Sequence, residues 1–568
     1  MTTKDSTRRN FIINTAALAA IGAATATAPS CTSPSKQAKS AAKPDGISAN
    51  TIKHAEKLAG ITFTTAERKQ ILNTIDEQLS ILAARLANGR IPNHTSPATI
   101  FAAQLPGTEL VRATPTGNPW SNLPDPGRCP TDDIELAFAP VWKLGQWLRE
   151  REVTSEKLTR LSLSRLKKFN PTLNCVITLT EDLAMQQADL ADRELDENKW
   201  RGPLHGVPWG AKDIIDTANI STTWGAAAYK DRVPNEDAFV IKRLQEAGAV
   251  LVAKLAVGAL AYGDIWFGGT CKNPFDTQEG SSGSSAGSAS ATAAGLVPFT
   301  LGSETYGSIV SPCMRCGTTG LRPTFGRVAR NGVMALCWTL DKIGPICRTV
   351  LDNALVLHAI NGSDPLDACS LDQPFTFNSS ESPKGIRLGY HPNSMIETCD
   401  LNALDAAKEA GVTIVKVEKP NIDNTPLLIP LLAEAAAAFE ELTRSDQDDL
   451  LSWQDDEAWP NSFRQSWFIP AVELVQASRI RRQAMNTMHT WMNNEIDAII
   501  CPAFDDLLLT TNATGHPSLV LRTNIQDDGK PIGTTLIGRL FDEGTLCRLG
   551  MAIEANLGVA SIRPPLAS

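Results

Sequence analysis

Two short runs rich in glycine and serine hold the residue types that could do chemistry in this chain. They occupy positions 280–290 and 302–308, and an apolar segment with Leu296, Val297, Phe299 and Leu301 separates them. A serine hydroxyl becomes a nucleophile when a base lies nearby, and glycine lets a ligand approach the main chain closely. A flexible Gly/Ser linker would be solvated along its whole length, and this segment is too apolar for that. We therefore interpret the stretch as a packed core with a serine-lined site.

A base for such a serine lies upstream, and the motifs together resemble a known family. The chain reads GPLHGVP at 202–208, followed by Lys212 and Asp213, then NPFD at 273–276, GSSAG at 283–287 and GSETYGSI at 302–309. This order resembles the amidase signature family of serine amidohydrolases, whose hallmark is a Ser–cis-Ser–Lys triad. Ser284 and Ser308 are 24 positions apart, as the two catalytic serines of the family are.

The resemblance implies a role for each of these residues. Ser308 would attack the amide carbonyl, Ser284 in a cis peptide would relay its proton, and Lys212 would be the ultimate base. A lysine with the ordinary pKa of about 10.4 is protonated at neutral pH, so Lys212 needs burial, which lowers its pKa. The resemblance implies neither a metal nor an organic cofactor. The oxyanion hole would be made by the backbone N–H groups of Thr305, Tyr306, Gly307 and Ser308.

The chain departs from the family pattern beside the nucleophile. Tyr306 replaces a small glycine, Glu304 stands where aspartate is common, and Val310 replaces a common arginine. These changes leave the three triad residues in place and affect the expected substrate preference. By contrast, we expect Asp213, Arg327, His205 and His516 to support the fold rather than to react.

The composition excludes some classes of function. The 568 residues carry a formal charge of −9, with 42% hydrophobic and 20% charged residues, which is ordinary for a globular enzyme. Nucleic-acid binding is not expected, because no basic excess is present. The seven histidines show no paired metal-ligand spacing. Cys313 and Cys316 form a single CxxC with no second pair, so we interpret them as packing residues, and disulfides among the twelve cysteines stay open if the protein is exported.

The amino terminus resembles a twin-arginine export signal. Arg8 and Arg9 precede an alanine-rich apolar run at 13–28, so we predict a signal peptide at 1–30 and a disordered tether at 31–50. Cys31 is an alternative lipid attachment site, and a disordered amino-terminal tail is a second alternative. No later apolar run reaches 18 residues, so no transmembrane helix is predicted. The predicted location is periplasmic or extracellular.

The rest of the chain is predicted to be an α/β protein. Ile71, Ile75, Leu79 and Leu82 recur at helical spacing within an added amino-terminal helical region and connector at 51–130. The amidase domain is predicted at 131–568, with a divergent helical region at 427–491. Its alternating helices and apolar strands predict a central mixed β-sheet covered by helices on both faces. One helix is predicted at 155–169, ending at the Asn170-Pro171 pair.

The expected function is an exported amidase that hydrolyses a small-molecule or peptide-like carboxylic amide through an acyl-serine. Its expected partners are that substrate and the twin-arginine translocase, and a homodimer stays open. Two alternatives remain. One is a glutaminase resembling the glutaminase-like subunit of tRNA-dependent amidotransferases, and the other is a catalytically inactive binding protein on the same fold.

Overall fold

The structure is a computed structural model that describes residues 46–87, 89–108, 120–394 and 398–567. The predicted signal peptide at 1–30, the alternative lipid site Cys31 and most of the predicted tether at 31–50 lie outside the described residues. Within the described ranges, no helix is both long enough and apolar enough to cross a membrane.

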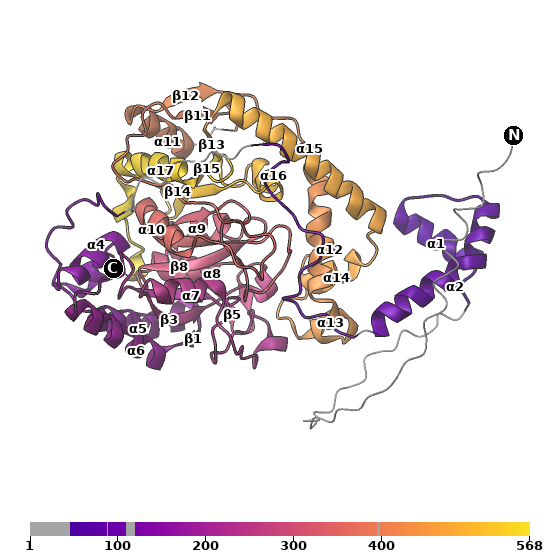
Figure 1. Cartoon of the computed structure of the whole chain (residues 1–568), viewed down its shortest axis with the longest axis horizontal. Helices are drawn as coiled ribbons and strands as arrows, with labels where there is room; N and C mark the ends of the chain where they lie inside the picture. The colour runs from indigo at the N-terminus through magenta and orange to yellow at the C-terminus, as the bar shows by residue number, and fades with distance from the viewer. Residues whose placement is uncertain (1–45, 88, 109–119, 395–397, 568) are drawn as a thin grey trace. The chain divides into compact units, whose positions relative to one another are not determined.

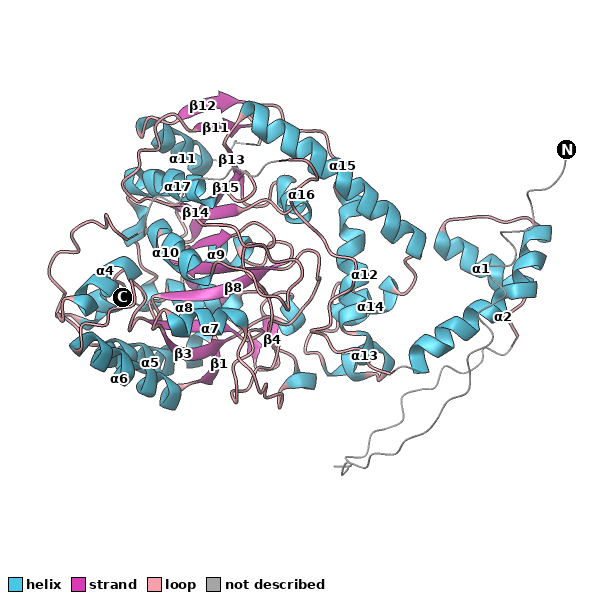
Figure 2. Ribbon diagram, in the orientation of Figure 1, coloured by secondary structure: helices cyan, strands magenta, loops and turns pink. Residues whose placement is uncertain are grey.

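The sequence predicts a central mixed sheet, and the described residues form one, with eleven strands. Figures 1 and 2 show its arrangement. Its strand order is β1-β3-β2-β8-β10-β9-β14-β15-β13-β11-β12. Strand β2 runs parallel to β3 and β8, whereas β10 runs antiparallel to β8 and β9. The strands are β1 Val176–Leu179, β2 Pro208–Lys212, β3 Val250–Leu255, β8 Phe299–Glu304, β9 Thr319–Arg322, β10 Lys342–Cys347, β11 Arg387–Tyr390, β12 Thr413–Lys416, β13 Ala498–Pro502, β14 Ser518–Ile525 and β15 Pro531–Gly538. Two small two-stranded sheets pair β4 Ile265–Trp266 with β5 Gly269–Thr270, and β6 Lys272–Asn273 with β7 Asp276–Gly280.

Helices cover both faces of the large sheet because alternate strand residues point to opposite faces. In β10, Ile343 and Cys347 belong to the core cluster that includes α10 (Val350–Ile360) and α17 (Glu543–Leu557). Ile346 instead packs with α9 (Val310–Cys316). The other α-helices are α1 Ala49–Ala59, α2 Thr65–Ala87, α3 Asp133–Ala137, α4 Val141–Arg149, α5 Ser155–Leu173, α6 Glu181–Asp196, α7 Phe239–Glu246, α8 Ala286–Ala293, α11 Thr398–Glu409, α12 Leu428–Ala438, α13 Glu440–Arg444, α14 Trp459–Ser466, α15 Ala471–Glu495 and α16 Leu507–Thr514.

Helix α5 continues past its predicted end at Asn170 and Pro171. It ends at Leu173, and Asn174 then adopts a left-handed conformation with φ 48° and donates its N–H to the Asn170 carbonyl at 2.8 Å. Pro171 therefore lies in the last turn, where a single missing N–H removes only one helical hydrogen bond. The left-handed asparagine, rather than the proline, ends the helix.

Two helices precede the connector, at the positions where the apolar period predicts helix. Helices α1 and α2 are joined by an ion pair between Arg68 and the buried Glu56, with Nε 2.6 Å from the carboxylate. Helix α2 buries none of its described residues, and the side chains of Ile81 and Leu82 are 70% and 52% exposed. The period of this segment thus predicts a helix without predicting its burial.

Candidate active site

Lys212 ends strand β2 and lies at the centre of a cluster of serine hydroxyls. Its side chain is fully buried. The Nζ atom donates hydrogen bonds to Ser284 Oγ at 2.8 Å, Ser303 Oγ at 2.9 Å and Ser285 Oγ at 3.1 Å. No ion pair joins Lys212 to a carboxylate in the described part of the chain. The surroundings of Nζ are therefore polar without offering an opposite charge.

This environment favours the neutral amine of Lys212. Burial lowers the pKa of Lys212 to about 7, although the carboxylates of Asp341 and Glu304 favour the charged form. Desolvation disfavours an ammonium group, and serine hydroxyls do not replace the charge stabilisation that water provides. A base whose pKa lies near neutral pH is suited to proton transfer.

Ser284 lies in the turn between β7 and α8, and its peptide bond to Gly283 is cis. The neighbouring Ser282 adopts a left-handed conformation with φ 59°, and its N–H donates to Asp264 Oδ2 at 2.8 Å. A Cβ atom on Gly283 would lie 1.8 Å from the carbonyl oxygen of Gly263. Only glycine therefore fits at position 283, which explains one glycine of the GSSAG turn.

Ser308 lies in the turn between β8 and α9, and its residue is 8% exposed. The N–H of Ser285 donates to the Ser308 carbonyl at 3.2 Å, which links the two serine turns. Among the described residues, no hydrogen bond is donated by the backbone N–H groups of Tyr306, Gly307 or Ser308, or made by the Ser308 hydroxyl. These groups are therefore free to meet a substrate carbonyl.

Glu304 fixes the turn that carries Ser308. Its fully buried carboxylate accepts the N–H groups of Ile309 at 2.8 Å and Val310 at 3.0 Å, and pairs with Arg322 Nη1 at 2.7 Å. Asn512 Nδ2 donates to the same carboxylate at 2.9 Å. Burial alone would raise the pKa of Glu304, but Arg322 and the backbone donors outweigh it and lower the pKa to about 2. Sequence reasoning treated Glu304 only as a departure from the family pattern and did not find this role.

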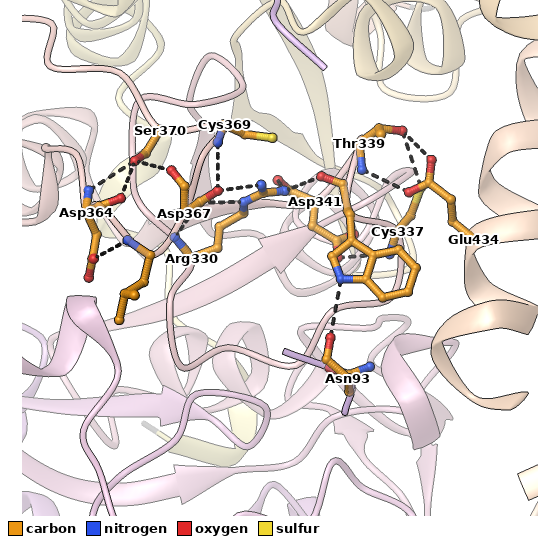
Figure 3. Close-up of polar contacts among 12 residues, drawn as sticks. Asn93, Arg330, Cys337, Thr339, Asp341, Asp364, Asp367, Cys369, Ser370 and Glu434 are labelled. Atoms are coloured by element: carbon orange, nitrogen blue, oxygen red, sulfur yellow. Dashed lines mark hydrogen bonds and ion pairs between the residues drawn. The ribbon is translucent and has the colours of Figure 1, made fainter. Parts of the chain in front are cut away.

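A second carboxylate anchors Thr305 from the residue that precedes strand β10. Thr305 Oγ1 donates to Asp341 Oδ1 at 2.6 Å, and the N–H groups of Leu336 and Cys337 donate to Asp341 Oδ2 at 2.8 and 3.0 Å. Burial raises the pKa of Asp341, and these donors oppose the rise. The loop at 330–341 therefore supports the turn at 305–308, which is predicted to form the oxyanion hole. Figure 3 shows the polar contacts of this loop.

The divergent helical region at 427–491 forms hydrogen bonds with this loop at Thr339. Glu434 of α12 accepts the Thr339 N–H at 3.0 Å and the Thr339 hydroxyl at 2.7 Å (Figure 3). Arg481 of α15 donates to the Thr339 carbonyl at 2.6 Å. Of the tryptophans in this region, Trp459 is buried and Trp467 is 46% exposed. The region thus contacts the site through charged residues that sequence reasoning did not single out.

A segment that precedes the predicted amidase domain also reaches the loop. The side-chain amide of Asn93 donates to the Ala335 carbonyl at 2.8 Å and accepts the Ala335 N–H at 2.9 Å. Trp338 Nε1 donates to the Asn93 carbonyl at 3.3 Å (Figure 3). A cavity of about 60 Å³ lies between this segment and the site, and its lining includes His94, Ser96, Ser303, Thr305, Trp338 and Lys342.

The residues expected to support the fold lie in separate buried contacts. Asp213 pairs with Lys254 at 3.3 Å and Arg327 pairs with Glu543 at 2.8 Å. His516 is buried, and burial lowers its pKa to about 3. Among the described residues, no group of three or more histidine, cysteine or acidic side chains could hold a metal ion. The two cysteines of the CxxC at 313–316 are free buried thiols.

Comparison with known proteins agrees with this geometry. The chain matches the family described as Amidase over residues 157–507, so it belongs to the amidase family and is an amide-hydrolysing enzyme. The predicted family membership and the mixed α/β fold with helices on both faces are confirmed.

Individual relatives cover most of the chain. It is 32% identical over 490 residues to a glutamyl-tRNA(Gln) amidotransferase subunit from Chloroflexus aggregans, covering 76% of this chain and 99% of that protein. A protein of the same name from Geobacter sulfurreducens is 40% identical over 327 residues, and this match covers 55% of this chain and 67% of that protein. The solved structure of peptide amidase from Stenotrophomonas maltophilia matches with a TM-score of 0.67 and 27% identity. The match covers 76% of this chain and 99% of that structure's chain.

Proposed function

We propose that the chain is a serine amidohydrolase that cleaves a carboxylic acid amide to the acid and an amine or ammonia, through an acyl intermediate on Ser308. The observation that carries this proposal is the buried Lys212 amine, 2.8 Å from Ser284 Oγ and without a carboxylate partner in the described residues. A lysine in these surroundings accepts a proton instead of balancing a charge.

The reaction balances with the residues present. Ser308 Oγ attacks the carbonyl carbon while its proton passes through the Ser284 hydroxyl to the Lys212 amine. The carbonyl oxygen becomes an oxyanion that faces the free N–H groups of Tyr306 and Gly307. When the C–N bond breaks, the proton returns by the same route to the leaving nitrogen. A water molecule then attacks the acyl carbon and loses its proton along the same path to Lys212. When the bond between the acyl carbon and Ser308 Oγ breaks, that proton returns to Ser308 Oγ and the acid is released.

A second candidate function is suggested by the relatives that are named as amidotransferase subunits. A glutaminase would form the same acyl-serine but release ammonia from glutamine to a partner protein. We favour the hydrolase because Arg8, Arg9 and the apolar run at 13–28 resemble an export signal. We accordingly propose export, and an exported protein would be separated from cytosolic tRNA.

The test is labelling of the purified protein with a fluorophosphonate, followed by intact-mass analysis and peptide mapping. We expect a single adduct on Ser308 that is lost in Lys212→Ala and in Ser308→Ala. Ser282→Ala, a neighbour in the same serine cluster, should keep the adduct and serves as the control. A folded protein that forms no adduct would overturn the hydrolase proposal and favour the inactive binding protein.

A panel of amides then separates the two catalytic candidates. We expect turnover of peptide amides or small carboxylic amides by the protein alone, with kcat/KM rising with pH through about 7 as Lys212 loses its proton. If the unlabelled protein releases ammonia only from glutamine, and only with a partner protein, that result would support the amidotransferase instead.

A further inference from the structure

A second cavity lies at the opposite end of the sheet from the predicted triad. Its volume is about 440 Å³, and its lining includes Gly317, which precedes β9, and Arg348, which follows the last residue of β10. Asp341 and Lys342, beside the candidate active site, lie at the other end of β10. The six residues of β10 separate Asp341 from Arg348, and these seven steps along the strand span roughly 23 Å at a rise of about 3.3 Å per residue. The cavity is therefore separate from the candidate active site.

The lining of this cavity is strongly basic. Five cationic side chains line it, from Arg128, Lys143, Arg348, Arg522 and Arg563. Among the described lining residues the acidic side chain is Glu135, and Arg563 already binds both of its carboxylate oxygens, at 2.8 and 2.7 Å. A formal charge of +4 thus faces one cavity in a chain whose net charge is −9. Charges of one sign in a concave site with low-dielectric walls attract ions of the opposite sign.

The two deepest arginines are held by carbonyl groups rather than by carboxylates. The Nη atoms of Arg348 donate to the carbonyls of Thr292 and Val297, both at 3.0 Å, and to those of two further residues. The Nη atoms of Arg522 donate to the carbonyls of Ile562, at 2.9 Å, and Val559. Carbonyl dipoles fix the orientation of a guanidinium but do not cancel its charge. The Nε atoms of both arginines are buried without a hydrogen-bond partner among the described residues.

Two buried carboxylates act on these arginines electrostatically, without direct pairing in the described part of the chain. Asp352 and Glu554 influence Arg348 and Arg522 only through the longer-range field, and neither forms an ion pair with them within the described ranges. Burial raises the pKa of Glu554 to about 8, so that carboxyl is largely protonated at pH 7. Unpaired buried charge is costly, and a bound anion offsets this cost.

Most of the lining comes from parts of the chain outside the family match at 157–507. Arg128, Lys143, Arg522 and Arg563 all lie outside it, and only Arg348 lies inside. The basic character of the cavity is therefore built largely by segments that the family match does not include.

We propose that this cavity binds a small multivalent oxyanion, either a phosphate-type anion or a polycarboxylate. The fixed guanidinium charges attract the oxygen atoms of both groups, and the Nε–H groups of Arg348 and Arg522 are donors without a partner among the described residues. The exposed Arg128 and the half-buried Lys143 also line the cavity and would complete the contacts once the anion is bound.

The test is isothermal titration calorimetry of the purified protein with pyrophosphate and with citrate, using sodium chloride at matched ionic strength as the baseline. We expect saturable binding of at least one probe, weakened at least tenfold in the double variant Arg128→Gln/Lys143→Gln. The control Lys230→Gln/Lys242→Gln removes two exposed lysines elsewhere and should bind like the native protein. Ser308→Ala should also bind normally, because this site does not depend on amide hydrolysis.

Two outcomes would overturn the proposal. One is that neither probe produces saturable heat beyond chloride. The other is that the double variant at the cavity binds as tightly as the native protein. None of the four substituted side chains makes a buried contact that the fold needs. Circular dichroism should therefore show both double variants folded. If pyrophosphate binds and citrate does not, the ligand is of the phosphate type, and the reverse result identifies a polycarboxylate.

Discussion

Replacing Lys212 with methionine tests whether this lysine is neutral in the folded protein. Methionine has a similar length and carries no charge, so it fits the same space without the desolvation cost of an ammonium group. The three serine hydroxyls lose a donor, but hydroxyl groups rotate to other acceptors. The variant should lose amide hydrolysis and fluorophosphonate labelling, because the proposed base is gone.

The size of the effect on stability follows from the pKa of Lys212. It is about 7 in the folded protein and about 10.5 in the unfolded chain, so between these values the unfolded chain binds more protons. Wild-type stability therefore rises with pH in that window. Each pKa unit corresponds to about 1.4 kcal/mol, and integrating from pH 6 to pH 9 gives a rise of about 3 kcal/mol from this residue. Lys212→Met removes that rise.

Urea unfolding of both proteins at pH 6 and pH 9 measures this effect. The difference in free energy of unfolding, variant minus wild type, should be about 3 kcal/mol more favourable to the variant at pH 6 than at pH 9. The contrasting control is Lys254→Met, because Lys254 is equally buried but pairs with Asp213 at 3.3 Å. That change strands a buried carboxylate and should cost roughly 3–5 kcal/mol. If Lys212→Met destabilises the protein equally at both pH values, the lysine is not desolvated as the structure indicates.

Two further changes test the groups around the site. Glu304→Gln leaves Arg322 without a buried counter-charge, so we expect the free energy of unfolding measured in urea to fall by roughly 3–5 kcal/mol. We also expect kcat to fall at least about 100-fold, because the turn at 305–308 loosens. An unchanged kcat would contradict the role given to Glu304. Asn93→Ala removes the paired hydrogen bonds to Ala335, so KM for a good amide substrate should rise up to about tenfold with kcat unchanged. Arg85→Ala, which removes an exposed ion pair elsewhere in the same amino-terminal part, should leave KM unchanged, and equal effects of the two variants would exclude a specific role for Asn93.

Local sequence was enough to predict the elements and the serine turns. A period of 3.6 residues depends on neighbours in the chain, so the helix α2 could be predicted from the spacing of Ile71, Ile75, Leu79 and Leu82. The motif spacing likewise indicated Ser284 and Ser308, because the resemblance to the amidase signature family implies two catalytic serines 24 positions apart. Pro171 was misread because a stop signal in the last turn competes with the capping residue that follows it, Asn174.

Contacts between distant segments were decided only by the tertiary structure. Glu304 meets Asn512 across 208 positions, and Asn93 meets Ala335 across 242. Neither pairing leaves a periodic signal, because each depends on which strands and loops become neighbours. The pKa of Lys212 has the same origin, since burial and the field of Asp341 are properties of the assembled site. The sequence alone thus determined which side chains could react, and the tertiary structure decided their protonation and support, because electrostatic and packing energies depend on distance in space and not on distance along the chain.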